Sequence, residues 1–416
     1  MTTVYNEDIL FFDGINVLDL ALLNQTPFYL YSENIITNNF LAYQKSFGDN
    51  PHLICYSVKA NSNLSILSLL AKLGSGFDIV SGGELSRVIQ AGGNPSKTVF
   101  SGVGKTEEEI RFALSKNIMC FNIESRDELH TINSIALEKK MCANVSIRIN
   151  PAIDIDTHPY ITTGMQDNKF GIEQSEILDI YKEAYELKGI NITGIDFHIG
   201  SQITDIDPFK ESVLKVIAII KTLQKNDIKL SHIDIGGGLG ISYNNEESPD
   251  KSLFISTILD LLKPLETTIL IEPGRSIVGE AGLLVSKVIN TKKSSSKNFV
   301  IVDAGMTDLL RPPLYSAYHS IKEVFHTDTN KILCDVVGPV CETADFIGKD
   351  RNLSLSKGDY IAVECVGAYG FALSSNYNTR LKSAEYLITK DGGNIRKIRD
   401  RDTIEQVLEN ETKYLS

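Results

Sequence analysis

The stretch His52-Leu-Ile-Cys-Tyr-Ser-Val-Lys-Ala-Asn61 begins as a short apolar run, which predicts a buried strand, and delivers Lys59 at its end. Asn61 and Ser62 offer N-cap side chains for an amphipathic helix over residues 64–73. A lysine between a buried strand and a helix has two interpretations. Its stem packs at the strand edge while the charge reaches water, or its amine is partly desolvated and forms a Schiff base with a carbonyl compound.

The same alternation continues over residues 28–272. The predicted strands are residues 52–58, 76–80, 98–101, 119–123, 144–149, 194–198, 232–236 and 269–272. The predicted helices are residues 35–46, 64–73, 84–91, 107–115, 125–137, 174–187, 208–224 and 253–263. Strands that alternate with helices are typical of a parallel sheet, and eight such units favour an α/β fold of the closed (β/α)8 TIM-barrel type. A doubly wound open sheet is the structural alternative.

The remaining segments predict two further parts. Residues 1–29 form an N-terminal arm that we expect to pack with the C-terminal domain, and residues 30–275 form the barrel. Residues 276–416 form a mainly antiparallel β-domain, because short β-like runs there are separated by Gly, Asp and Asn. These runs are residues 283–289, 298–302, 332–337, 360–366 and 385–389.

One connection is long for a compact domain. Pro151–Gly171 follows a predicted strand and has no clear period. Loops of this length are often binding loops or lids, and the alternative is that the segment merely packs.

Composition excludes several classes of partner. The 41 Lys and Arg residues against 53 Asp and Glu give a net charge of −12, which argues against nucleic acid and anionic membranes. There is no apolar run of membrane-span length, and the acidic start is unlike a secretory signal. The six cysteines show no zinc spacing, so we expect reduced thiols, a cytoplasmic protein and no structural metal.

Unusual residues follow the last three predicted barrel strands, at the end where TIM barrels carry their sites. They are His198-Ile-Gly-Ser201, Gly236-Gly-Gly-Leu-Gly240 and Glu272-Pro-Gly-Arg275. Glycines let backbone N–H groups approach a phosphate, and Glu272 and Arg275 add an acid and a cation to the same rim. Together with Lys59 they are suited to a phosphorylated, aldehyde-bearing aromatic cofactor, pyridoxal 5'-phosphate.

The chain resembles the fold-type III, alanine racemase-like pyridoxal-phosphate decarboxylases (the Orn/Lys/Arg decarboxylase class-II family), and among them the diaminopimelate decarboxylases. The matching stretches span nearly the whole chain in the family's order. They are Tyr56-Ser-Val-Lys-Ala-Asn61, Phe77-Asp-Ile-Val-Ser-Gly-Gly-Glu84, Thr157-His-Pro-Tyr-Ile-Thr-Thr-Gly164, Lys169-Phe-Gly171, Phe197-His-Ile-Gly-Ser-Gln202, Gly236-Gly-Gly-Leu-Gly240, Glu272-Pro-Gly-Arg-Ser-Ile-Val278, Asp303-Ala-Gly-Met306, Arg311-Pro-Pro-Leu-Tyr315, Val340-Cys-Glu-Thr-Ala-Asp345 and Gly367-Ala-Tyr369. Thr343 stands where the family often has Ser, a small departure.

The resemblance implies a cofactor site. Lys59 would bind the aldehyde, His198 would stack on the ring, and Glu272 would keep the ring nitrogen protonated, which favours decarboxylation over racemisation. Asp78 and Glu84 would tune the lysine and the ring, although either could be an ordinary cap or surface acid. The full cofactor-binding set is Lys59, Asp78, His198, Ser201, Gly237, Gly238, Glu272, Pro273, Gly274, Arg275 and Tyr369.

The resemblance also implies the catalytic set Lys59, Cys341, His198 and Glu272. Cys341 would donate the proton that replaces CO2, because a thiol titrates within reach of neutral pH; the alternative is a buried small hydrophobic residue. In the family this segment enters the active site of the other subunit, which predicts a homodimer with active sites at the subunit interface.

The substrate follows from charge. The expected substrate-binding residues are Arg275, Arg311, Tyr315, Glu342 and Tyr369. An Arg fork suits a carboxylate and a Glu suits an ammonium, although Arg311 could instead form a structural salt bridge. A far end with both groups is that of meso-2,6-diaminopimelate, which would be decarboxylated to L-lysine and CO2 in the last step of lysine biosynthesis. The alternatives are decarboxylation of carboxynorspermidine or ornithine, and a non-catalytic pyridoxal-phosphate-binding homologue.

Overall fold

The computed structural model describes residues 3–151, 169–244, 246–327, 331–390 and 393–415. The chain forms two compact units. One comprises Asn39–Ile241 and Glu247–Ser276, and the other comprises Met1–Asn38, Ser242–Glu246 and Ile277–Ser416. Residues 30–38 and 242–246, which we expected in the barrel domain, belong to the second unit, and Ser276, which we expected in the β-domain, belongs to the first.

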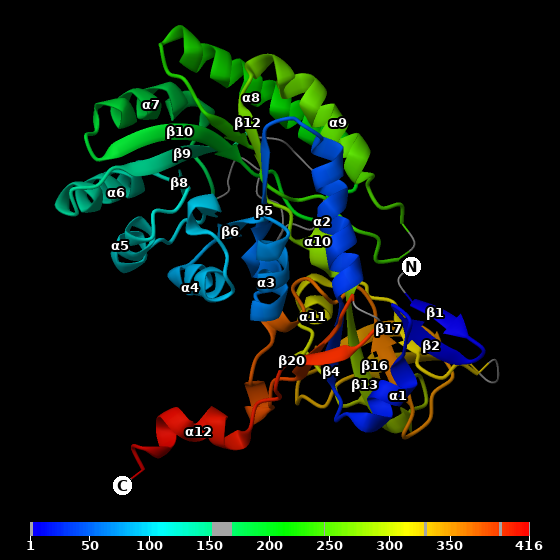
Figure 1. The fold of residues 1–416 in the computed structure, drawn as a ribbon. Helices are drawn as coiled ribbons and strands as arrows, with labels where there is room; N and C mark the ends of the chain where they lie inside the picture. The colour runs from blue at the N-terminus through cyan, green and yellow to red at the C-terminus, as the bar shows by residue number, and fades with distance from the viewer. Residues whose placement is uncertain (1–2, 152–168, 245, 328–330, 391–392, 416) are drawn as a thin grey trace. The chain divides into compact units, whose positions relative to one another are not determined.

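The first unit is a closed barrel, as predicted. Its eight strands pair in parallel in the order β10-β11-β12-β5-β6-β7-β8-β9, and helices lie outside them (Figure 1). The strands are β5 (His52–Ser57), β6 (Gly76–Ile79), β7 (Thr98–Phe100), β8 (Cys120–Ile123), β9 (Ala143–Ile149), β10 (Ile190–Phe197), β11 (His232–Asp234) and β12 (Thr268–Ile271). The helices are α2 (Glu33–Phe47), α3 (Leu64–Lys72), α4 (Gly82–Gln90), α5 (Glu107–Ser115), α6 (Arg126–Glu138), α7 (Ile177–Glu186), α8 (Asp207–Lys225) and α9 (Lys251–Leu262).

Capping side chains define where the barrel helices begin. The N-cap of α4 is Ser81 and that of α5 is Thr106, which forms a capping box with Glu109. The N-cap of α3 is Asn63, whose side chain accepts a hydrogen bond from the backbone N–H of Ser65. The prediction that Asn61 or Ser62 caps this helix is therefore wrong: the helix begins at Leu64, as predicted, and the N-cap is the residue directly before it.

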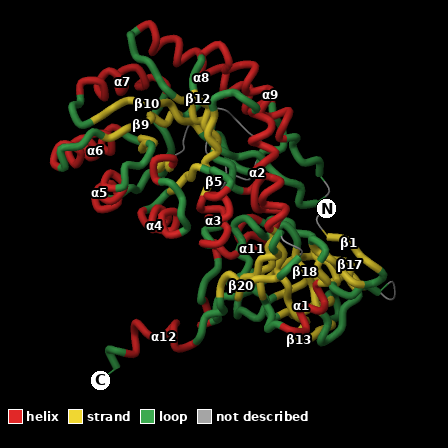
Figure 2. The backbone as a smooth tube through the Cα atoms, in the orientation of Figure 1, coloured by secondary structure: helices red, strands yellow, loops and turns green. Residues whose placement is uncertain are grey.

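The second unit is built on a mainly antiparallel sheet, as predicted. Its central path is β17-β16-β14-β13-β4-β19-β20, with β15 and β18 paired beside it; only β14–β16 and β4–β19 pair in parallel among the described strands. The strands are β4 (Phe28–Ser32), β13 (Gly282–Lys293), β14 (Asn298–Val302), β15 (Ile321–Glu323), β16 (Ile332–Val337), β17 (Phe346–Leu353), β18 (Tyr360–Val363), β19 (Ala384–Ile388) and β20 (Ile395–Arg399). Figure 2 shows these strands gathered together, with few helices.

The start of the chain contributes to this second unit. It forms β1 (Thr3–Asn6), β2 (Ile9–Phe12), β3 (Ile15–Asn16) and α1 (Val17–Leu23). Leu10 and Phe12 are buried in one apolar cluster with Leu283, Val285 and Ile388 of the sheet. Short helices α10 (Arg275–Val278) and α11 (Arg311–Tyr315) and the C-terminal α12 (Ile404–Thr412) complete the elements.

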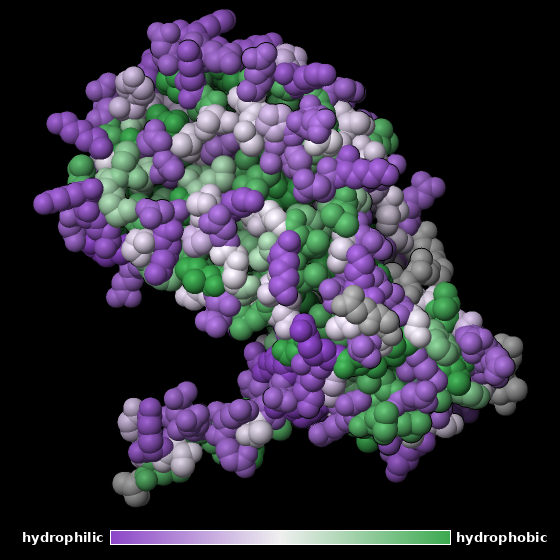
Figure 3. Space-filling view, viewed as in Figure 1, coloured by the Kyte–Doolittle hydropathy of each residue, from purple (hydrophilic) through white to green (hydrophobic). Residues whose placement is uncertain are grey.

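The outer surface of the barrel helices is polar. Purple, hydrophilic side chains cover much of this face in Figure 3. Within the described part of the chain, no helix combines the length and the apolar character that crossing a membrane requires.

Candidate active site

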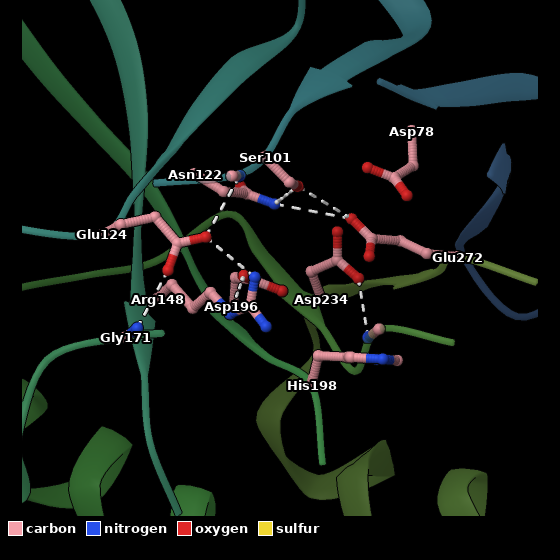
Figure 4. A network of polar contacts seen from close by, with 12 residues as sticks. Asp78, Ser101, Asn122, Glu124, Arg148, Gly171, Asp196, His198, Asp234 and Glu272 are labelled. Carbon is pink, nitrogen blue, oxygen red and sulfur yellow. Dashed lines mark hydrogen bonds and ion pairs between the residues drawn. The ribbon is translucent and has the colours of Figure 1, made fainter. Parts of the chain in front are cut away.

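Every barrel strand contributes a buried polar residue at or just beyond its C-terminal end. In strand order these are Ser57, Asp78, Ser101, Asn122, Arg148, Asp196, Asp234 and Glu272, each at most 7% exposed. We call this set the polar ring. Successive side chains of a strand point to opposite faces, so the apolar ones face the helices and the residues of the polar ring face the inside of the barrel. Figure 4 shows most of the ring side chains converging. This end of the barrel is thus a buried polar surface.

Lys59 lies at the edge of the polar ring. Its Nζ is 2.6 Å from Asp78 Oδ2, and its side chain is 39% exposed whereas that of Asp78 is fully buried. Ser57 Oγ lies 2.8 Å both from the same Asp78 oxygen and from the carbonyl oxygen of Glu272. The amine is therefore oriented by a buried carboxylate and remains accessible, which is what bond formation to a carbonyl carbon requires.

Glu272 reaches into the ring from the end of β12. One of its carboxylate oxygens lies 3.4 Å from Ser101 Oγ and 3.5 Å from Asn122 Nδ2. Carboxyl oxygens of Asp196, Asp234 and Glu272 all lie within 4.8 Å of one another. Burial, followed by the charge of Asp234, raises the pKa of Glu272 well above its ordinary range.

Arg148 supplies a buried positive charge on the other side of the ring. Its Nη1 is 2.8 Å from Glu124 Oε1 and its Nε is 3.7 Å from Asp196 Oδ2. Glu124 also accepts hydrogen bonds from the backbone N–H groups of Gly102 and Gly171. These contacts, drawn in Figure 4, hold the loops after β7 and β9 to the ring.

The turn Gly236–Gly240 follows β11 and leaves no room for a side chain at Gly237 or Gly238. A Cβ at Gly237 would lie 2.2 Å from the carbonyl oxygen of Glu272, and one at Gly238, whose φ is +109°, would lie 2.3 Å from that of Gly200. The N–H of Gly237 donates to His198 Nδ1 at 3.2 Å, so the neutral ring carries its proton on Nε2. Burial lowers the pKa of His198 well below its ordinary value, which keeps the imidazole neutral.

A cation lies beside this turn. Arg275 is buried and its Nη2 donates to Ser201 Oγ at 3.0 Å. Glycine N–H groups, a hydroxyl and a guanidinium are together the donor set that binds a phosphate.

These residues fit pyridoxal phosphate. Glycine is obligatory at Gly237 and Gly238, and Ser201 and Arg275 supply further donors. Lys59 offers an oriented amine. The buried carboxyl groups of Asp196, Asp234 and Glu272 lie together, so the ring has the acidic groups that a cationic ring nitrogen requires.

Several other predicted residues lie in the second unit and are described within it. Arg311 is buried; its Nη1 lies 2.8 Å from His319 Nε2, and its guanidinium lies 4.6 Å from the ring centre of Tyr243. His319 Nδ1 is 2.9 Å from the carbonyl oxygen of Glu364, which can only accept, so Nε2 accepts from Arg311. Tyr315 is half-buried in the same short helix, α11. Arg311 is thus oriented by an imidazole and a phenol ring.

Cys341 and Glu342 are exposed on a loop that Asp345 organises. The buried Asp345 carboxylate accepts the N–H groups of Met306 and Val340, both at 2.6 Å. The Cys341 N–H donates to Asn378 at 3.2 Å, and Glu342 accepts from the Tyr377 hydroxyl at 2.6 Å. The alternative that Cys341 is a buried small hydrophobic residue is therefore wrong for this chain, because its loop is turned outward.

Other predicted residues have local roles that the structure describes. Glu84 stabilises the loop after β6, because its carboxylate accepts a hydrogen bond from the Val80 N–H at 2.7 Å. Pro273 and Gly274 follow Glu272, and a Cβ at Gly274 would meet Ala60 at 2.9 Å. Tyr369 is half-buried with a positive φ of 57°. The segment 152–168, which contains the predicted Thr157–Gly164 motif and most of the candidate lid, lies outside the described residues.

The sequence reasoning missed seven members of this site: Ser57, Ser101, Asn122, Glu124, Arg148, Asp196 and Asp234. Six of them are ring residues and the seventh, Glu124, is the partner of Arg148. A signal was present, because a polar residue recurs near the end of successive apolar strands. It becomes informative only when the inward face of each strand is known.

The chain is similar to known pyridoxal-dependent enzymes over nearly its whole length. A family model for the pyridoxal-dependent decarboxylase, pyridoxal binding domain, matches residues 33–279. The chain is 48% identical to a diaminopimelate decarboxylase of Haemophilus influenzae over 405 residues, 97% of each protein.

Solved structures give the same result. Diaminopimelate decarboxylase from Helicobacter pylori, complexed with L-lysine, superposes with a TM-score of 0.92 at 47% identity, covering 96% of this chain and 100% of that one. The enzyme from M. jannaschii, also with L-lysine, gives 0.93 at 36% identity, covering 99% and 97%. On this similarity over nearly its whole length, the chain belongs to the diaminopimelate decarboxylase family of pyridoxal-dependent decarboxylases.

Proposed function

We propose that this protein decarboxylates meso-2,6-diaminopimelate to L-lysine and CO2, the last step of lysine biosynthesis by this route. The observation that carries the proposal is the accessible amine of Lys59, held 2.6 Å from buried Asp78 on a ring that also contains Glu272. Family membership selects the substrate, since relatives of 44–48% identity are diaminopimelate decarboxylases.

The cofactor is pyridoxal phosphate, and we assign its contacts to the residues of the barrel site. Lys59 binds the aldehyde, Gly237, Gly238 and Ser201 bind the phosphate, and Glu272 holds the ring nitrogen. When bound, the cofactor supplies an electron sink for the negative charge left on the substrate when CO2 departs. His198 offers a neutral, flat surface for the ring, and we assign Asp78, Pro273, Gly274, Arg275 and Tyr369 to the same site.

We assign substrate recognition to Arg275, Arg311, Tyr315, Glu342 and Tyr369. A guanidinium binds a carboxylate through two parallel hydrogen bonds, and a carboxylate binds an ammonium. The far end of diaminopimelate carries both groups, so Arg311 and Glu342 are complementary to it. Cys341 donates the proton that replaces CO2, and its exposed position is compatible with reaching a bound substrate.

The test is to incubate the protein with pyridoxal phosphate and meso-diaminopimelate and to quantify lysine. Borohydride treatment of the loaded protein should add the mass of the reduced cofactor at Lys59. Lys59→Ala should abolish both results, whereas Lys72→Ala, at an exposed lysine of α3, should abolish neither. Lysine production by the Lys59→Ala variant at the wild-type rate would contradict the assignment.

The same assay separates the alternatives. Turnover of ornithine or carboxynorspermidine without turnover of diaminopimelate would replace the proposed substrate. Labelling at Lys59 without CO2 release from any of these amino acids would indicate a non-catalytic pyridoxal-phosphate-binding protein.

We further propose a homodimer with shared active sites and a cytoplasmic location. The exposed Cys341 loop supports the first, and six cysteines without a disulfide in the structure support the second. Mixing Lys59→Ala protein with Cys341→Ala protein tests the dimer. If each site takes its lysine from one subunit and its thiol from the other, mixed dimers regain one intact site, and no recovery after subunit exchange would contradict the proposal.

A further inference from the structure

Asp234 and Glu272 face each other inside the polar ring. Figure 4 shows their carboxyl groups pointing toward one another, and their oxygens lie within the 4.8 Å cluster that also includes Asp196. Asp234 is fully buried and Glu272 is 6% exposed. Two carboxylates at this separation and burial do not both ionise, because water does not reach them to offset their repulsion.

Two cations lie near these acids, Arg148 in the ring and Lys59 at its edge, and both form ion pairs with other acids. Lys59 pairs with Asp78 at 2.6 Å. Arg148 pairs with Glu124 at 2.8 Å and approaches Asp196 at 3.7 Å. Of the acids in the polar ring, Asp234 and Glu272 are therefore the two that form no ion pair within the described residues.

The two carboxyl oxygens of Asp234 have different surroundings. Its Oδ1 accepts the N–H of Gly236 at 2.9 Å, which anchors the glycine turn. Its Oδ2 is fully buried and has no hydrogen-bond partner within the described chain. Two carboxylates cannot bond to each other because both only accept, whereas one added proton creates an O–H donor between them.

The groups that face this pair come from every neighbouring strand. They are Cys55 of β5, Lys59 after it, Asp78 of β6, Cys120 of β8, Glu124 after it, Arg148 of β9, Asp196 of β10 and His198 after it. Burial raises the pKa of Asp234 to about 7, with Asp78 adding to the rise. Burial, together with the negative charges of Asp78 and Asp196, favours retention of a proton by the pair.

We propose that Asp234 and Glu272 share one proton at neutral pH, and that Asp234 is the neutral hydrogen-bond donor when Glu272 faces the cationic ring nitrogen of the cofactor. Asp234 is then a positioning residue: one oxygen holds the glycine turn, and the protonated oxygen orients the Glu272 carboxylate. The second half of this proposal rests on the proposed cofactor, whereas the first half concerns the cofactor-free protein alone.

Infrared spectroscopy of the cofactor-free protein tests the shared proton directly. A protonated carboxyl has a C=O stretch that is separate from carboxylate bands and shifts in D2O. The wild type should show this band at neutral pH, and the band should weaken as the pH is raised further and the shared proton is lost. Asp234→Asn and Glu272→Gln should each remove one carboxyl equivalent of the band.

Glu124→Gln is the matched control, because Glu124 is buried at the same ring but has Arg148 as its cation partner. It should leave the band intact. Persistence of the band in both Asp234→Asn and Glu272→Gln would overturn the proposal, and so would its absence from the wild type. If one variant does not fold, the other still decides.

Measuring cofactor affinity shows whether Asp234 acts as a neutral hydrogen-bond donor or whether its negative charge is required. Asn at position 234 can still accept from Gly236 and has an amide that donates permanently to Glu272. Asp234→Asn should therefore change the dissociation constant of pyridoxal phosphate by less than about tenfold, since a neutral hydrogen bond is replaced by another. A loss of about 100-fold or more would show that the charge of Asp234 is required and would overturn the donor role. Absence of cofactor binding in the wild type would instead refute the proposed function, and the infrared result would stand separately.

Discussion

Replacing Gly237 by Ala tests how the glycine turn and Glu272 depend on each other. The new Cβ would lie 2.2 Å from the carbonyl oxygen of Glu272, so that carbonyl must move by about 1 Å to reach an ordinary contact distance. Ser57 Oγ lies 2.8 Å from the same oxygen, so the shift also disrupts this hydrogen bond. Overpacking costs about 1–3 kcal/mol and the hydrogen bond about 1 kcal/mol, so we expect the barrel to lose roughly 2–4 kcal/mol.

The measurement is urea unfolding of the cofactor-free protein, followed by titration with pyridoxal phosphate. Gly237→Ala should lower the unfolding midpoint and weaken cofactor binding by about tenfold or more, because Glu272 moves with its carbonyl. Gly104→Ala is the matched control: it lies on the same barrel, and no atom comes within 4 Å of its Cβ. Equal midpoints and affinities for the two variants would show that the turn is not held as tightly as the structure indicates.

Three further predictions concern other groups. Arg148→Met should destabilise the protein by about 3–5 kcal/mol in chemical unfolding, since it leaves Glu124 and Asp196 buried without their cation; a loss below about 1 kcal/mol would contradict this pairing. Burial lowers the pKa of His232 to about 4, so the unfolded chain binds a proton between pH 6.5 and 4 that the folded chain does not, and stability should fall as the pH is lowered through this window. His232→Gln should flatten that part of the stability–pH curve, and an unchanged slope would exclude His232 as its cause. Cys341→Ala should slow lysine formation heavily while cofactor binding is retained, whereas Cys142→Ala, at an exposed cysteine of the barrel, should leave the rate unchanged; equal rates for the two would remove Cys341 from the mechanism.

The eight barrel strands could be located from the sequence because each is a short apolar run between amphipathic segments. Strand β14 over residues 298–302 and helix α5 over residues 107–115 have the predicted bounds. Strands β4, β15, β17 and β20 were not predicted. For β17 the reason is visible in Phe346–Leu353, where charged residues interrupt the apolar pattern.

At the site, too, local sequence features could be predicted, whereas contacts between strands could not. Lys59, His198, Glu272 and the glycine turn could be named from the chain because glycine runs and isolated ionisable residues after strands are local features. The pairings of Arg148 with Asp196 and of Asp234 with Glu272 join neighbouring strands that are separated in sequence by a whole helix. Hydrophobic periodicity is local and specifies strands, helices and their alternation, whereas which buried charges meet depends on barrel closure and strand register, since these alone bring the inward side chains of eight separate strands into one ring.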